Sequence, residues 1–106
     1  MEGIMGIFSE KIKDTVTVFI TGDIDEHTAP ELREYFDKLI ERGGFRYMVI
    51  NMNEVDFMDS TGIGMLIGRY KKLKNLSIPL YVAEVSKQID KIFKLSGLYD
   101  IIEMVR

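Results

Sequence analysis

The segment 57-FMDSTGIGMLIGRYKKLK-74 carries the strongest structural signal in the chain. Its apolar side chains recur at helical spacing and predict an amphipathic helix. Those side chains belong to Ile63, Leu66, Ile67, Tyr70 and Leu73. An aspartate and a serine, Asp59 and Ser60, stand where this helix is expected to begin. Polar residues are common there because their side chains accept hydrogen bonds from the unpaired backbone N–H groups of the first turn.

Ser60 has two interpretations at this position. In the first it is the N-cap, and its hydroxyl only satisfies a backbone N–H group. In the second the start of the helix accepts a phosphate, because the helix dipole favours an anion there by roughly 0.3–1 kcal/mol. Thr61 places a second hydroxyl beside it. The residues alone leave both interpretations open.

Three glycines in the same helix require a structural reason. Gly62, Gly64 and Gly68 each cost roughly 1 kcal/mol relative to alanine inside a helix. Gly64 and Gly68 are four residues apart on one face, which predicts close packing of the helix backbone against the sheet or a neighbouring helix. Gly62 lies beside the serine, and we expect it to leave the start of the helix open to a partner.

Outside this segment, strand-like and helix-like stretches alternate in the order β-β-α-β-α-β-α-β. The other elements are expected at 3–9, 15–21, 28–44, 46–52, 79–85, 87–97 and 101–105, with a polar hairpin turn over 10–14. Strands separated by helices of this length predict right-handed crossovers. The fold class is therefore α/β, a small mixed, mainly parallel sheet flanked by helices, with the first strand antiparallel at or near an edge.

The helix at 28–44 has clear signals at both ends. Thr28 and the glutamate three residues later fit a capping box, and Pro30 lies in the first turn. Gly43 and Gly44 are expected to end it. One face should be apolar, formed by Leu32, Tyr35, Phe36, Leu39 and Ile40. In the same way, Ser86 is expected to cap the last helix and Gly97 to end it.

Polar residues gather in two predicted loops, 21-TGDIDEHT-28 and 51-NMNEVDFMDST-61. Both follow parallel strands, so we expect them to lie side by side at the carboxyl edge of the sheet. Asp23 and Asp25 in the first loop are typical of a solvated turn before a helix. They also resemble the D-x-D-x-T loop of aspartate-nucleophile phosphatases, but Thr28 comes one residue late and the chain is too short for that fold.

Composition argues against several functional classes. The 106 residues include 17 acidic and 14 basic side chains with no basic stripe, so nucleic acid is not an expected partner. Cysteine is absent and His27 is the only histidine, which argues against a zinc site and a serine-hydrolase triad. The sequence has no phosphate-binding loop with lysine and no apolar run of roughly 18 residues. We expect one cytoplasmic domain, residues 1–106, with no cofactor and no membrane contact.

The helix at 57–74 ends in a basic run formed by Arg69, Lys71, Lys72 and Lys74. Cations are favourable at a helix C-terminus because of the dipole. We interpret this run as a solvated helix end, with contact to a partner as the second interpretation.

Three segments, ITGDIDEHTAPELRE, FMDSTGIGMLIGRYKKLK and IFKLSGLYDII, follow one another along the chain. Together they resemble a bacterial anti-sigma factor antagonist of the STAS domain family, from about Thr15 to Ile102. The pairing of D-S-T-G-[IL]-G with an upstream G-[DE]-[IL]-D carries the resemblance. The family fold, a small mixed sheet flanked by helices, agrees with the order of elements above.

The resemblance implies a non-enzymatic switch. Such proteins, when unphosphorylated, bind an anti-sigma factor that is itself a serine kinase, and so release a sigma factor for transcription. The kinase phosphorylates the serine that corresponds to Ser60, and a PP2C-type phosphatase restores the active form. The implied partner-binding surface consists of Asp23, Asp25, Asp59, Ser60, Thr61 and Gly62.

Two other classes fit some of these residues. A carrier protein would also present an aspartate–serine pair at a helix start, but carrier proteins are helical bundles, and TVTVFIT and YMVINM favour strands. A small hydrolase or phosphatase is the other alternative, and generic ester and phosphate substrates would reveal it.

Overall fold

The computed structural model describes residues 5–105, so the first two residues of the strand expected at 3–9 lie outside the described part. Within that part, one sheet of five strands is combined with three α-helices and a short 3₁₀ turn. The elements are β1 (Gly6–Ile12), β2 (Thr15–Ile24), α1 (Ala29–Arg42), β3 (Tyr47–Met58), α2 (Ser60–Asn75), β4 (Leu80–Ala83), α3 (Lys87–Ser96), the 3₁₀ turn (Leu98–Asp100) and β5 (Glu103–Met104). The predicted order and fold class are confirmed, and a helical carrier bundle is excluded.

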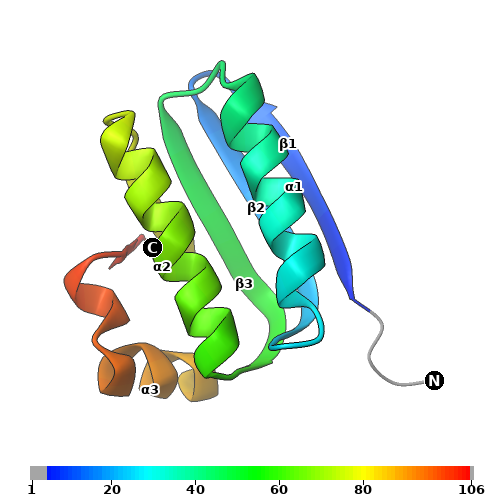
Figure 1. Ribbon diagram of the computed structural model, residues 1–106. Helices are drawn as coiled ribbons and strands as arrows, with labels where there is room; N and C mark the ends of the chain where they lie inside the picture. The colour runs from blue at the N-terminus through cyan, green and yellow to red at the C-terminus, as the bar shows by residue number, and fades with distance from the viewer. Residues whose placement is uncertain (1–4, 106) are drawn as a thin grey trace.

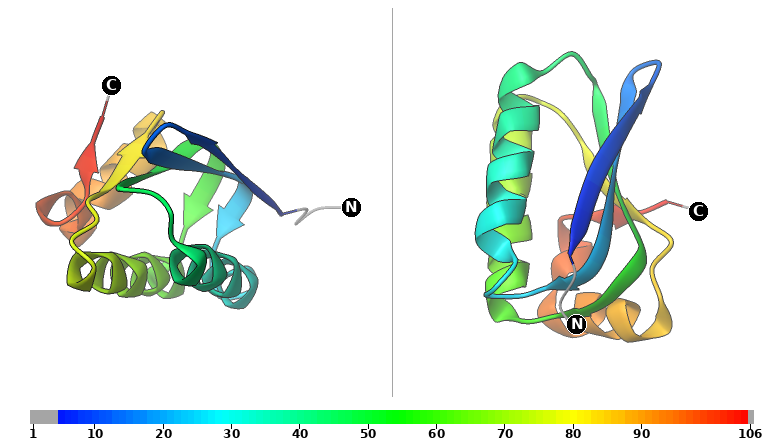
Figure 2. Two further views of the ribbon diagram at one scale, coloured as in Figure 1. Left: turned by 90° about the horizontal axis from the view of Figure 1, so that it is seen from above. Right: turned by 90° about the vertical axis from the view of Figure 1, so that its right-hand side faces the viewer.

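The strands lie in the sheet in chain order, β1-β2-β3-β4-β5. β1 pairs antiparallel with β2 at one edge, and the remaining pairs are parallel. α1 and α2 lie side by side on one face of the sheet (Figure 1), because right-handed crossovers that advance in one direction place their helices on the same face. α3 lies at the end of the sheet where β2 and β3 terminate (Figure 2).

The main part of the core lies between the sheet and the helices α1 and α2. Alternate residues of β2 and β3 are buried on the helix side: Val16, Val18, Ile20, Met48, Ile50 and Met52. The predicted apolar face of α1 is confirmed, since Leu32 and Phe36 are fully buried and Tyr35 packs against the core from its edge. Among residues 5–105, no helix is long and apolar enough to cross a membrane.

Both central strands are longer than predicted. β3 continues to Met58 and β2 to Ile24, so most of the two predicted loops is strand. The register between the strands shifts in two places near Gly22, which has a φ of 105°. These irregularities break the strict alternation of buried and exposed side chains that identifies a strand. The exposed polar residues near the end of β3 were therefore predicted to form a loop. The hairpin turn is also tighter than the predicted 10–14, because β1 extends to Ile12.

The buried face of α2 differs from the predicted one. Its buried residues are Gly62, Met65, Leu66, Arg69 and Leu73, whereas Ile63, Ile67 and Tyr70 are only half-buried. The helix contacts α1 along one side as well as the sheet beneath it, so the face directed at the core is turned toward α1.

Arg69 is the clearest departure from the predicted solvated helix end. It is only 7% exposed, and its Nε lies 3.2 Å from Oδ1 of Asp37 on α1. Lys72 places its ammonium 3.1 Å from the same oxygen. Burial lowers the pKa of Arg69; the charge of Asp37 opposes this change and that of Arg33 adds to it. The guanidinium stays protonated at neutral pH, so Asp37 supplies the countercharge that a buried cation requires.

This ion pair predicts an asymmetry between two carboxylates of α1. Asp37→Ala leaves Arg69 buried without its countercharge. It should lower the free energy of unfolding by about 3 kcal/mol, the low end for a buried pair, because the Asp37 side chain is 29% exposed. Glu34→Ala is the control, because it breaks only the exposed pair with Lys38 and should stay within about 0.5 kcal/mol of the wild type. Adding Arg69→Met to Asp37→Ala should recover most of the loss in urea unfolding. Equal effects of Asp37→Ala and Glu34→Ala would contradict this role.

Candidate functional site

The N-cap of α2 is Asp59, not Ser60. Asp59 has extended backbone angles, and its Oδ1 accepts a 2.8 Å hydrogen bond from the Gly62 N–H group. Ser60 is the first residue of the helix, and its side chain is exposed. Of the two interpretations of Ser60, the one in which its hydroxyl caps the helix is therefore wrong. Both residue types suit an N-cap, and β3 ends at Met58, which leaves the extended position to Asp59.

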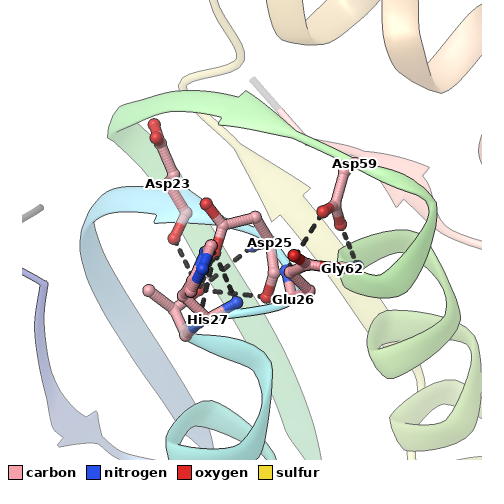
Figure 3. A network of polar contacts seen from close by, with 7 residues as sticks. Asp23, Asp25, Glu26, His27, Asp59 and Gly62 are labelled. Carbon is pink, nitrogen blue, oxygen red and sulfur yellow. Dashed lines mark hydrogen bonds and ion pairs between the residues drawn. The ribbon is translucent and has the colours of Figure 1, made fainter.

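Asp59 also connects the two polar segments, which lie side by side as predicted (Figure 3). Its Oδ2 accepts a 3.1 Å hydrogen bond from the Glu26 N–H group. Its own N–H group donates to the Ile24 carbonyl over 3.2 Å. The start of α2 is thus bonded both to the end of β2 and to the turn that follows it.

The turn between β2 and α1 is closed by Asp25 and Thr28. Oδ1 of Asp25 accepts from the N–H groups of His27 and Thr28 at 2.9 and 3.1 Å. Oγ1 of Thr28 accepts from the Asp25 N–H group and donates to the Asp23 carbonyl. The capping box predicted for Thr28 is wrong, because this hydroxyl is used by the preceding turn and makes no capping bond to α1.

Gly62 lies at a close approach between the backbones of α2 and β2. A Cβ atom at this position would lie 2.0 Å from the Ile24 carbonyl oxygen, a distance that no side chain can tolerate. The residue is therefore buried rather than open to a partner. Gly64 and Gly68 have nothing within 4 Å of such an atom, so the close packing predicted for them is wrong.

The other residues of the predicted site lie around this junction. Ser60 and Thr61 are exposed, and Asp25 is largely buried, with a side chain 20% exposed. Asp23 is half-buried in β2, and in Figure 3 its carboxylate points away from the bonds around Asp25. The structure brings Asp25, Asp59 and the two hydroxyls to one end of the sheet, and it places the Gly62 backbone beneath them.

The ionisable side chains of this surface lie close to neighbouring groups of the same segments. The exposed His27 ring lies 3.9 Å from Oδ1 of Asp25, and the Asp59 carboxylate is occupied by two backbone N–H groups. Within residues 5–105, no group of three potential ligands is placed to hold a metal ion. The sequence interpretation missed the double role of Asp59. The position of Asp59 directly before the helix indicated an N-cap, but the neighbouring Ser60 fitted an N-cap equally well.

The fold and this surface together define a small α/β domain that presents an exposed serine at the N-terminus of a helix. The family model of the STAS domain matches residues 7–106. The chain therefore belongs to the STAS domain family.

Similar proteins carry related names. An anti-sigma-B factor antagonist from Listeria monocytogenes is 34% identical over 95 residues, which cover 90% of this chain and 82% of that protein. The crystal structure of an anti-sigma factor antagonist from Mycobacterium paratuberculosis has a TM-score of 0.85 at 23% identity and covers 95% of this chain and 85% of that one. The phosphorylated form of the Bacillus cell fate determinant SpoIIAA has a TM-score of 0.71 at 24% identity, covering 95% and 92%. The two solved structures support the fold.

The contact at Gly62 gives a sharp stability prediction. Gly62→Ala should lower the free energy of unfolding by about 3 kcal/mol, because the added methyl group must push α2 away from β2. Gly64→Ala is the matched control in the same helix turn, and it should gain roughly 0.5–1 kcal/mol from the lost flexibility of the unfolded chain. Urea unfolding of both variants tests the difference, and similar stabilities would contradict the close contact.

Proposed function

We propose that this protein is an anti-sigma factor antagonist that is switched by phosphorylation of Ser60. Unphosphorylated, it binds an anti-sigma factor with serine kinase activity and so frees a sigma factor for transcription. The kinase modifies Ser60, and a PP2C-type phosphatase reverses the modification. The observation that carries this proposal is the exposed Ser60 in its D-S-T-G element, in a chain whose relatives bear the antagonist name.

The local geometry suits Ser60 as a phosphate acceptor. Because Asp59 caps the helix, the Ser60 hydroxyl is not required for that purpose. A phosphate on the first residue of α2 lies at the positive end of the helix dipole, which favours an anion. The folded protein can therefore carry the group at little cost in stability.

The surrounding charges support partner release as the consequence. Four acids lie near the carboxyl ends of β2 and β3: Asp23, Asp25, Asp56 and Asp59. Phosphorylation of Ser60 adds a charge of roughly −1.5 to −2 beside them. In a docked interface this dianion must lose water next to other acids. A penalty of even ~3 kcal/mol weakens binding more than a hundredfold.

Binding rather than catalysis is the proposed role. Two of the acids near Ser60 are engaged in structural bonds, since Asp59 holds two backbone N–H groups and Asp25 closes the turn. In this role the protein acts as one domain in the cytoplasm, on a protein partner and without direct contact to nucleic acid or membrane. A net charge of −3 is consistent with the absence of a nucleic-acid surface.

The first test separates Ser60 from Thr61. ATP and magnesium alone should leave the mass of the protein unchanged, and an anti-sigma kinase from the same genome should add one phosphate. Ser60→Ala should stay unmodified and bind the kinase persistently, with a stability within about 0.5 kcal/mol of the wild type because the cap is Asp59. Ser60→Asp should bind weakly, and Thr61→Ala should still accept phosphate. Mass spectrometry that finds the phosphate on Thr61 of Ser60→Ala would overturn the assignment.

The second test separates the charge of Asp25 from its role in the turn. Asp25→Asn keeps an oxygen for the His27 and Thr28 N–H groups but removes the charge. It should bind the kinase about tenfold more weakly with nearly unchanged stability. Asp25→Ala should in addition lose about 1 kcal/mol, because the turn loses its acceptor.

The control for this test is Asp14→Asn, an exposed carboxylate in the hairpin turn at the other end of β2. It should bind the kinase as the wild type does. Wild-type affinity of Asp25→Asn would show that the partner does not recognise this carboxylate charge.

A further inference from the structure

The Asp59 carboxylate is shared between two segments that are far apart in the sequence. Oδ1 accepts from the Gly62 N–H group of α2, and Oδ2 accepts from the Glu26 N–H group, 33 residues earlier in the chain (Figure 3). One oxygen therefore caps the helix that carries Ser60, and the other holds the turn that carries Asp25.

The remaining bonds of this turn do not reach α2. Asp25 and Thr28 bond to each other, the His27 N–H group donates to the Asp25 carboxylate, and the Thr28 hydroxyl donates to the Asp23 carbonyl. The Ala29 N–H group donates to the Asp25 carbonyl to begin α1. Within the described part of the chain, the bond from Glu26 to Asp59 is the one hydrogen bond that joins residues 25–28 to the start of α2. Without it the turn keeps its internal hydrogen bonds but has none to the start of α2.

We propose that Asp59 is a positioning residue that fixes the turn at 25–28 against the start of α2, so that the kinase meets Asp25 and Ser60 as one surface. This inference rests on the proposed function. A carboxylate suits the task because it has two acceptor oxygens, whereas an asparagine or serine side chain offers only one acceptor atom. The Asp59 carboxylate is directed at the N–H groups of Glu26 and Gly62. Its proposed effect on the kinase is indirect, through the positions of Asp25 and Ser60.

The experiment compares two substitutions that keep the helix cap and lose the connection. Asp59→Asn retains one oxygen for the Gly62 N–H group and turns its amide N–H groups toward that of Glu26. Asp59→Ser caps α2 with a hydroxyl, as Ser86 caps α3 over 3.2 Å. Ser86→Ala is the control, because it removes a cap from a helix outside this surface.

The expected result has two parts. In both Asp59 variants, NMR should show amide exchange at Glu26 accelerated about tenfold, with protection at Gly62 retained. Phosphorylation of Ser60 by the anti-sigma kinase should then lose about tenfold in kcat/KM, mainly through KM, because the acceptor is intact but the surface is no longer assembled. Ser86→Ala should be phosphorylated as the wild type is.

Two outcomes would overturn the inference. One is an unchanged exchange rate at Glu26 in both Asp59 variants. The other is a wild-type KM in variants whose Glu26 amide has become free. Failure of the wild-type protein to bind or accept phosphate from any anti-sigma kinase of its genome would instead refute the proposed function, and the positioning role for a kinase would fall with it. The exchange measurement needs no partner and separates these cases.

Discussion

The approach of the Gly62 backbone to the Ile24 carbonyl is the constraint on which the site depends. With no side chain at Gly62, the first turn of α2 can lie directly on the end of β2. That contact brings the Asp59 N–H group within 3.2 Å of the same carbonyl and its carboxylate within reach of Glu26. Successive helical residues are rotated by about 100°, so a glycine that faces inward turns Ser60, two residues earlier, toward solvent. The exposure of the serine thus follows from the burial of the glycine.

The architecture could be predicted because its signals are local and repeated. The apolar face of α1, Pro30 in its first turn and the glycines at its end all agree on one helix, and the structure confirms it. Ser86 and Gly97 delimit α3 as predicted. The alternation of such helices with apolar strands determines a mainly parallel sheet, and a parallel sheet places the carboxyl ends of β2 and β3 at one edge. The side-by-side position of the two polar segments followed from that order.

The details of the site could not be predicted because they depend on contacts between distant segments. Asp59 and Ser60 both suit an N-cap, and the choice is made by where β3 ends. The length of β3 was hidden by its register shifts against β2, which only the paired strands reveal. Arg69 resembled the lysines that follow it. Its spacing from Leu66 and Leu73 places it on the buried face, but the countercharge that permits burial comes from α1.

The same contacts determine how α2 can respond to a new charge. At its start the helix is held by the Gly62 contact and the two oxygens of Asp59. In its second half it is held to α1 by the buried pair of Arg69 with Asp37. A helix fixed at both places would keep its position if Ser60 were phosphorylated, and its N-terminus would stabilise the anion. The free domain would therefore absorb the modification without refolding, and the cost would arise when a partner covers and desolvates the charge. Under the proposed function, the rigidity of α2 would convert phosphorylation of Ser60 into a change of binding affinity.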